Sequence, residues 1–225
     1  MLGALQIATS QLACSANFAA KVVGTANYVL LSAGHCGTAG TEWYHKQGPL
    51  ANNQPKCDAI CQLSAYDIGA GGRNAFGNNS SADAQRIGLR NGDQTSSIYT
   101  DGTIHDITSV QAEQGAYVGE PTCVSGSGGE FHTGMGVHCG TVRNADLTTF
   151  STEPGSNVTT TLVHQIKASY TSCAGDSGGP IYDGHMAMGV QSSTELLPGE
   201  VCAHPSFLSK AAQEESQLDV TILTG

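Results

Sequence analysis

The sequence predicts an all-β fold, and three observations support this prediction. Short apolar runs alternate along the chain with clusters of turn residues, a pattern typical of β-sandwiches and β-barrels. Glycine is abundant, with 29 among 225 residues, and turns and bulges need the positive φ angles that glycine adopts easily. Charged residues make up only 12 % of the chain, which is low for a soluble protein. These features together indicate a turn-rich β protein.

The expected elements follow from this pattern. Residues 22–31 are typical of two strands joined by a turn, and further strands are predicted at 97–100, 104–110, 136–142, 158–166 and 186–191. Turns are expected at the glycine-rich clusters 69–72, 77–81 and 125–129. One helix is predicted at 209–218, with Ser206 or Ser209 as its N-cap, followed by a strand at 220–223. No fixed-period repeat and no linker divides the chain, so a second domain would pack directly on the first.

Charge and hydropathy exclude several classes of protein. Nine Lys and Arg residues against 19 Asp and Glu residues give a net charge of −10, so we expect no nucleic-acid partner. The apolar fraction of 39 % is too high for a disordered chain. No apolar run approaches the roughly 20 residues of a membrane span, so we expect no membrane partner.

The eight cysteines indicate an oxidising compartment, in which thiols pair. The first residues lack the basic and apolar regions of a signal peptide, so we expect a signal to have been removed from a secreted, extracellular protein. Cys57 and Cys61 have the spacing of half a zinc site, but no second pair of this spacing lies nearby. We therefore predict neither a metal nor a cofactor.

The segment Cys173-Ala-Gly-Asp-Ser-Gly-Gly-Pro180 is the strongest chemical signal. A nucleophilic serine needs a tight turn that exposes its hydroxyl, amides that face the oxyanion, and a general base. The glycines around Ser177 allow such a turn, and the amides of Gly175 and Ser177 could form an oxyanion hole. Asp176 could anchor the loop through an ion pair or buried hydrogen bonds. Composition alone, however, favours a glycine-rich surface turn.

A second segment, Leu30-Leu-Ser-Ala-Gly-His-Cys36, changes that balance. It places His35 at the end of an apolar strand, beside a cysteine that can fix the loop. A lone histidine in such a position is usually structural. Together with Ser177, which follows 142 residues later, His35 would supply the base and the nucleophile of acyl transfer.

The two segments together resemble the chymotrypsin-like serine protease family, whose members carry His, Asp and Ser in this chain order. The similarity is to small secreted bacterial members, the streptogrisins and α-lytic protease, and extends to secreted proteases of plant-pathogenic actinobacteria, which would imply a role in virulence. Residues 118–126 and 138–142 resemble the hairpin of the second barrel in these proteases, and residues 187–192 resemble the strand that lines the substrate cleft. With the final helix and strand, the resemblance spans about residues 14–223.

This resemblance implies two packed six-stranded antiparallel β-barrels with a short C-terminal helix. The N-terminal barrel, at 1–114, would carry the histidine and the aspartate of a catalytic triad. The C-terminal barrel, at 115–225, would carry the nucleophile Ser177 and the specificity pocket.

Three aspartates compete for the acid of the triad, which orients the histidine. Asp67 fits best, because apolar and small residues follow it and it lies 32 residues after His35, close to the spacing in the small bacterial enzymes. Asp83 lies 48 residues after His35, nearer the spacing in the animal enzymes, but the polar pair that follows it does not suit a buried strand. Asp58 is too near His35 and stands between two cysteines. The predicted triad is therefore His35, Asp67 and Ser177.

The resemblance also places the substrate pocket. Thr171, six residues before the nucleophile, would lie at its base, and Ser192 would pair through its backbone with the substrate. The predicted pocket residues are Thr171, Ser172, Gln191, Ser192 and Thr194. No acidic residue stands at position 171 to select Arg or Lys, and the β-branched Thr194 would narrow the pocket, so we expect small-to-medium uncharged residues before the cut. A polar pocket that includes His204 and prefers Glu stays an alternative.

The eight cysteines would form four disulfide bonds by the same resemblance. The predicted pairs are Cys14–Cys36, Cys57–Cys61, Cys123–Cys139 and Cys173–Cys202. The implied protein is a secreted, monomeric serine endopeptidase that hydrolyses protein or peptide substrates through an acyl-enzyme. The alternatives are an inactive or weakly active homologue that binds a target in the same cleft, an esterase or transferase with the same triad, and a structural zinc protein.

Overall fold

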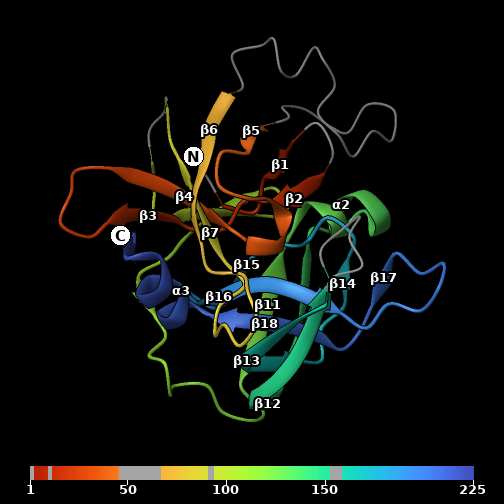
Figure 1. The fold of residues 1–225 in the computed structure, drawn as a ribbon. Helices are drawn as coiled ribbons and strands as arrows, with labels where there is room; N and C mark the ends of the chain where they lie inside the picture. Colours follow the sequence, from red (N-terminus) through yellow and green to blue (C-terminus); the bar gives the residue numbers. More distant parts are fainter. Residues whose placement is uncertain (1–2, 10–11, 46–66, 91–93, 153–158) are drawn as a thin grey trace.

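The structure is a computed structural model that describes residues 3–9, 12–45, 67–90, 94–152 and 159–225. β-Strands dominate it and form two large sheets, with short helices between them (Figure 1). In the described ranges, no helix combines the length and the apolar character needed to cross a membrane. The predicted all-β class is confirmed.

Eight strands form the first sheet, all paired antiparallel, in the order β19-β3-β4-β7-β6-β5-β1-β2. Their apolar side chains, among them Leu30, Trp43 and Ile87, point into a buried core. Their bounds are β1 Gln6–Ala8, β2 Ala13–Ser15, β3 Ala19–Val22, β4 Tyr28–Ser32, β5 Glu42–His45, β6 Asp67–Asn74, β7 Gln85–Gly88 and β19 Val220–Ile222.

The second sheet has the order β10-β16-β15-β11-β12-β13-β18, and a further pairing between β16 and β18 closes six of these strands into a barrel. Short β10 adds at the edge of the barrel, parallel to β16. The bounds are β10 Ser109–Val110, β11 Pro121–Ser125, β12 Val137–Thr152, β13 Thr159–Ala168, β15 Pro180–Asp183, β16 Met186–Thr194 and β18 Ser206–Lys210.

Smaller elements complete the described fold. Two strand pairs lie outside the large sheets: β8 Ser97–Thr100 with β9 Thr103–Asp106, and β14 Ser172–Cys173 with β17 Cys202–Ala203. The helices are the 3-10 turn η1 Gly34–Cys36, α2 Ser127–Thr133 and α3 Ala211–Leu218. The predicted C-terminal helix and the strand after it are thus present, although the helix begins two residues later than expected, because Ser209 belongs to β18.

The second barrel has a core of its own, around Val124, Ile166 and Leu208, and the core of the first sheet extends into it. The larger apolar cluster contains first-sheet residues together with Tyr182 and Val190 of the second sheet and Leu218 of α3. In addition, β19 pairs with β3 in the first sheet, whereas β10 joins the second. Each of these two strands thus belongs to the sheet opposite to the one that the predicted boundary between residues 114 and 115 assigns to it. That boundary stays a prediction.

Two glycine clusters that were expected to be turns belong to regular elements instead. Residues 69–72 lie in β6, where a Cβ on Gly69 would stand 1.8 Å from the carbonyl oxygen of Gly88. Gly69 also has a φ of +145°, so glycine at this position permits close strand pairing rather than a turn. Residues 127–129 begin α2. Glycine content alone therefore did not distinguish a turn from a tightly packed element.

Candidate active site

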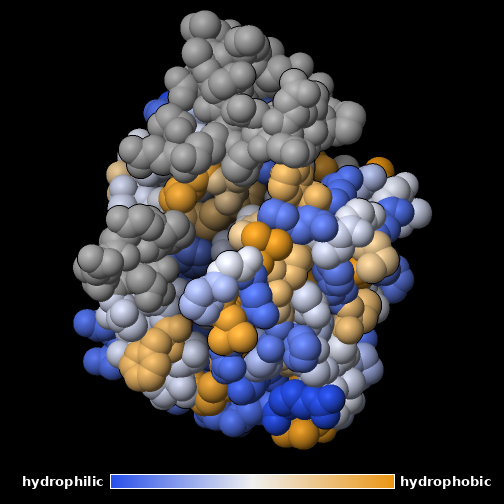
Figure 2. Space-filling model, turned by 90° about the vertical axis from the view of Figure 1, so that its right-hand side faces the viewer, coloured by the Kyte–Doolittle hydropathy of each residue, from blue (hydrophilic) through white to orange (hydrophobic). Residues whose placement is uncertain are grey.

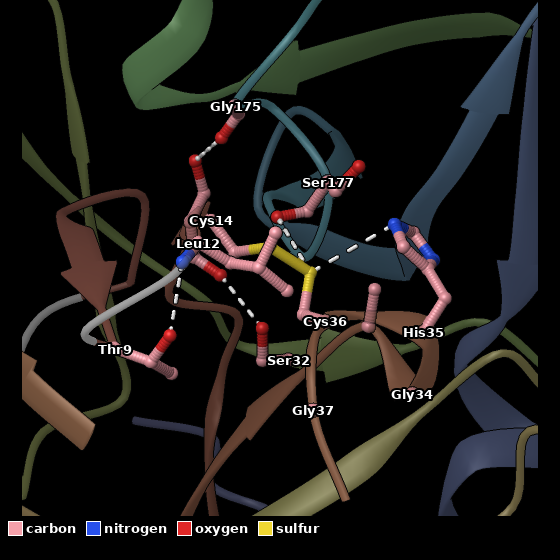
Figure 3. The surroundings of a disulfide bond; sticks show 12 residues. Thr9, Leu12, Cys14, Ser32, Gly34, His35, Cys36, Gly37, Gly175 and Ser177 are labelled. Atoms are coloured by element: carbon pink, nitrogen blue, oxygen red, sulfur yellow. Dashed lines mark hydrogen bonds between the residues drawn. A yellow bond between two sulfur atoms is a disulfide. The ribbon is translucent and has the colours of Figure 1, made fainter. Parts of the chain in front are cut away.

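His35 lies in η1, directly after the buried strand β4. The predicted Cys14–Cys36 disulfide joins this turn to β2, and Gln85 Nε2 donates a hydrogen bond of 2.8 Å to the carbonyl oxygen of Ala33. His35 is only 8 % exposed. Figure 3 shows His35 and Ser177 on two sides of the Cys36 sulfur, which lies 3.8 Å from His35 Nε2.

Asp83 is the carboxylate that contacts His35. Its Oδ2 lies 2.7 Å from His35 Nδ1, and its Oδ1 accepts a hydrogen bond of 2.9 Å from the His35 backbone N–H. Ser192 Oγ donates a third hydrogen bond, of 2.6 Å, to Oδ2. Asp83 is fully buried, just before β7.

The prediction of Asp67 as the acid is therefore wrong in this geometry. Asp67 begins β6, is partly exposed, and forms an ion pair with Arg90, which also binds Glu42. The spacing from His35 suited Asp67, but the β5–β6 pairing places its carboxylate beside Arg90 instead of the imidazole. Asp58, the third candidate, lies outside the described residues.

The hydrogen bonds fix the charge state of this pair. Burial raises the pKa of Asp83, but the adjacent His35 and the hydrogen bonds from His35 and Ser192 outweigh burial, so that the net shift is downward. Because the ionised carboxylate can only accept, His35 Nδ1 must carry the proton of this hydrogen bond. In the neutral ring, Nε2 is then the nitrogen that can act as a general base.

Ser177 lies in the turn that joins β14 to β15. Within residues 173–179, the amides of Gly175 and Ser177 are the two that donate no hydrogen bond to any described residue, whereas the other five amides do. Gly175 has a φ of +101°, which favours glycine. A Cβ on Gly128 would stand 2.4 Å from the Ala174 carbonyl oxygen, so this carbonyl points toward α2 and the trans amide of Gly175 points away from it.

Asp176 stabilises this turn through hydrogen bonds of its buried carboxylate. Its Oδ1 accepts a hydrogen bond of 2.7 Å from the Gly129 amide in α2, and its Oδ2 accepts one of 2.7 Å from the Cys173 amide. Burial raises the pKa of Asp176, and these amides, with nearby His138, offset the effect only in part. Of the two anchors that the sequence left open, the described structure has the buried hydrogen bonds.

Ser15 of β2 contacts the turn around Ser177, a role that the sequence did not reveal. Its amide donates a hydrogen bond of 2.7 Å to the Ser177 carbonyl oxygen, and its Oγ donates one of 2.8 Å to the Gly175 carbonyl oxygen. The first barrel thus holds the turn of the second (Figure 3). A single serine after a cysteine carries no signal of such a role.

A cavity of about 470 Å³ brings the predicted catalytic residues together. His35, Gly175 and Ser177 all line it, and so do four of the five predicted pocket residues, Ser172, Gln191, Ser192 and Thr194. Thr171 is not among the lining residues, so its expected place at the base of the pocket is not found. His204 does not line the cavity either. Phe150 and Leu196 add an apolar border.

The deep part of this cavity is polar but uncharged. Tyr170 Oη donates a hydrogen bond of 2.8 Å to Gln191 Oε1, and Gln191 Nε2 donates to Ser172 Oγ at 3.1 Å and to the Ser193 carbonyl oxygen at 2.9 Å. Both amide hydrogens of Gln191 are therefore used. Thr194 Oγ1 lies within 3.0 Å of two backbone carbonyl oxygens of the 203–205 segment.

Three of the four predicted disulfides are present. They are Cys14–Cys36, Cys123–Cys139 and Cys173–Cys202. The second joins facing residues of the β11–β12 hairpin, and the third joins β14 to β17 beside the nucleophile turn. The pair Cys57–Cys61 lies outside the described residues. In the ranges that the structure describes, no group of three or more His, Cys, Asp or Glu residues could hold a metal ion.

A comparison with protein families supports the geometry. The family model described as Trypsin matches residues 93–216, more than half of the chain. The chain belongs to the trypsin family. Ser177 and the cavity residues that follow it lie inside the match, whereas His35 and Asp83 precede it. As a member of this family, the chain is a serine endopeptidase.

Solved structures share the trypsin-family fold over almost the whole chain. Thermobifida fusca Protease A has a TM-score of 0.73 at 21 % identity, over 100 % of this chain and 98 % of that chain. Nocardiopsis protease has a TM-score of 0.72 at 23 % identity, over 99 % and 98 %. A glutamic acid-specific serine protease, described as using a histidine triad in substrate binding, has a TM-score of 0.73 at 22 % identity, over 99 % and 100 %.

The chymotrypsin-like double β-barrel is thus confirmed by solved bacterial proteases. No curated protein matches the chain significantly in sequence.

Proposed function

We propose that this trypsin-family chain is a secreted endopeptidase that cleaves peptide bonds through Ser177, His35 and Asp83. The observation that carries the proposal is the cavity in which His35 meets the two unpaired amides of Gly175 and Ser177. A general base and two adjacent free amides are what acyl transfer requires around a nucleophile.

The mechanism follows from these positions. Ser177 Oγ attacks the peptide carbonyl, and His35 Nε2 takes its proton. The amides of Gly175 and Ser177 stabilise the oxyanion of the tetrahedral intermediate. His35 then donates the proton to the leaving amine, which leaves an acyl-enzyme that water hydrolyses by the same steps. Asp83 orients the imidazole and stabilises the imidazolium throughout.

The cavity supports a preference for small-to-medium uncharged residues before the cut. Among the described residues that line it, His35 is the only one with an ionisable side chain, so these residues offer no counter-charge to a lysine or a glutamate of the substrate. Gln191 has no free donor for a substrate carboxylate, because its amide hydrogens already bind Ser172 and Ser193. The similar glutamic acid-specific protease is described as using a histidine triad in substrate binding, whereas His35 is the one histidine among the described residues of this lining.

Extracellular location, a monomeric state and a protein or peptide substrate complete the proposal. The three disulfides support an oxidising compartment. Apolar residues lie scattered among hydrophilic ones on the face shown in Figure 2, which favours a chain without a large permanent partner.

Covalent labelling with a fluorophosphonate and a peptide-library digest test the proposal together. The wild-type chain should label at Ser177 and cleave after uncharged residues, and Ser177→Ala should lose labelling and roughly 10⁶-fold in kcat. Ser193→Ala, which changes a neighbouring serine of the cavity, is the matched control and should still label. A chain that binds peptides but does not label would instead be an inactive homologue, and cleavage of esters alone would indicate an esterase.

A further inference from the structure

The loop that leads to Asp83 is held by the second barrel. The Asn79 amide donates a hydrogen bond of 2.8 Å to the Thr161 carbonyl oxygen, and the Val163 amide donates one of 2.9 Å to the Ser80 carbonyl oxygen. β13 therefore runs beside residues 78–81 and forms a parallel bridge with them across the barrel boundary. The position of the loop before Asp83, in the first barrel, therefore depends on β13 of the second barrel.

The side chain of Gln165 extends this contact to Asp83 itself. Its Nε2 donates a hydrogen bond of 2.9 Å to the Ser81 carbonyl oxygen, and its Oε1 accepts one of 2.7 Å from Ser209 Oγ. Ser209 Oγ in turn accepts a hydrogen bond of 2.8 Å from the Asp83 amide. Gln165, Ser209 and Asp83 are each 0 % exposed, so water does not compete for these bonds.

An irregularity of β13 accompanies this orientation of Gln165. The β12–β13 register shifts between Leu147, which faces Gln165, and Thr149, which faces Leu162. His164 lies inside the shift with a φ of +57°, an angle that is uncommon for a residue other than glycine. Such bulges redirect a side chain, and Gln165 Nε2 also donates 2.9 Å to the Val163 carbonyl oxygen next to it.

We infer that Gln165 is a positioning residue that fixes the triad acid from the opposite barrel. It lines no part of the cavity and touches neither Ser177 nor the imidazole. It holds segment 81–83 at both ends, directly at the Ser81 carbonyl and through Ser209 at the Asp83 amide. The inference rests on the proposed role of Asp83, because its position affects turnover only if its carboxylate orients the imidazole.

The contacts of Asp83 explain why a small displacement matters. Its carboxylate accepts three hydrogen bonds from two other segments, the histidine turn and Ser192 of β16. A shift of Asp83 by a few tenths of an ångström changes the geometry of all three bonds. Asp83 itself acts on buried Glu214 of α3, whose pKa is raised by burial and then by Glu215 and Asp83. A change at Gln165 removes none of these groups.

Gln165→Met tests the inference, because methionine keeps the length of the side chain and loses its donor and acceptor. We expect kcat to fall by up to about 10²-fold with KM unchanged, since misplacement by about 1 Å has an effect of that size. The matched control is Gln111→Met, which removes another buried glutamine whose hydrogen bond of 2.7 Å goes to Glu120. It should keep the wild-type kcat when both variants are assayed well below their melting temperatures.

A second readout does not depend on turnover. The proton between His35 Nδ1 and Asp83 Oδ2 should give a downfield proton resonance in the wild-type chain and in Gln111→Met, and this resonance should shift or broaden in Gln165→Met. If Gln165→Met does not fold, Ser209→Ala, which removes the hydrogen bonds of Ser209 Oγ with the Asp83 amide and with Gln165 Oε1, should show the same change.

An unchanged resonance and unchanged kcat in a folded Gln165→Met protein would overturn the inference. An inactive wild-type chain would instead overturn the proposed function, and the resonance alone would then decide whether Gln165 positions Asp83.

Discussion

Asp83 and Asp176 are both buried carboxylates beside the same cleft, and they keep their places by different means. Asp83 contacts a histidine that can carry a positive charge, and its pKa is lowered despite burial. Asp176 is held by backbone amides of two segments, and its pKa is raised. The difference shows that three backbone amides and His138 do not offset the loss of water at Asp176, whereas His35 and the hydrogen bonds from His35 and Ser192 do so at Asp83.

The two carboxylates also serve different purposes. In the proposed mechanism an ionised Asp83 is needed at the imidazole, because it stabilises the charge that develops there during acyl transfer. Asp176 shapes the turn that presents the amides of Gly175 and Ser177. We therefore expect replacement of the first to affect chemistry and replacement of the second to affect geometry.

Asp83→Asn should produce the largest effect. The amide removes the negative charge and favours the wrong tautomer of His35, so kcat should fall by about 10⁴-fold while the fold is retained. Hydrolysis of a peptide substrate measures this change. Asp67→Asn is the matched control and should keep kcat within a few-fold, because its partner is Arg90. A large loss in Asp67→Asn with an active Asp83→Asn would reverse the assignment of the acid.

Asp176→Asn should have the next largest effect. The new amide group cannot accept from both the Gly129 and the Cys173 amides, so the turn should relax and one oxyanion donor should be lost. Removal of one such donor lowers kcat by about 10²- to 10³-fold. The rate of fluorophosphonate labelling at Ser177 should fall with it. If labelling and turnover stay at the wild-type rate, Asp176 does not shape the oxyanion hole.

Gly126→Ala acts on Asp176 from outside the nucleophile turn. A Cβ at this position would stand 2.3 Å from Asp176 Oδ1, so we expect roughly a tenfold loss of kcat or more. Gly126 precedes α2, and Gly134→Ala at the other end of α2 is the control. It meets no atom within 4 Å and has a φ of +76°, so it should destabilise the fold by about 1 kcal/mol and leave kcat unchanged. Equal activity of the two variants would contradict this role of Gly126.

Glu214 extends the comparison to a third buried carboxylate, and its effect concerns stability alone. Burial, Glu215 and Asp83 raise its pKa well above the usual value of 4.5, although Asn17 donates a hydrogen bond of 2.9 Å to it. Because the folded-state pKa of Glu214 is raised, its protonated carboxyl contributes stability that is fully present below pH 4.5. This contribution is lost as pH rises through the folded-state pKa. Glu214→Gln should therefore become more stable than wild type as pH rises.

Guanidinium unfolding at a series of pH values measures the Glu214 effect. Glu113→Gln, at an exposed position, is the control and should follow the wild-type curve. Parallel curves for wild type and Glu214→Gln between pH 4 and pH 8 would show that Glu214 stays ionised inside the protein.

The histidine and the serine of the site could be predicted from the sequence, because their function depends on local backbone shape. The residues around Ser177 are mostly glycine, and His35 stands between a buried strand and a cysteine. Both signals lie within a few residues of the group concerned. Cys36 and Cys173 stand beside these two motifs, and the family resemblance then implied their partners, Cys14 and Cys202.

The acid could not be chosen by such local signals. Asp83 was disfavoured because polar residues follow it, yet each of these has a partner far away in the chain. Gln85 donates to the Ala33 carbonyl oxygen behind the histidine turn, and Arg86 Nη1 donates a hydrogen bond of 3.0 Å to the Leu218 carbonyl oxygen. The polar pair Gln85 and Arg86 therefore suits a strand at the boundary between the two barrels. The residues next to Asp83 in the sequence do not reveal these distant partners.

The pairing of β19 with β3 has a consequence for biosynthesis. Val220 of β19 pairs with Val22 of β3 across 198 positions of the chain, and β19 forms one edge of the first sheet. This edge is therefore completed only when residues 220–222 are available, unlike domains that fold in order as they emerge. Until then the open edge of β3 can pair with other chains, which makes a partly synthesised chain prone to aggregation.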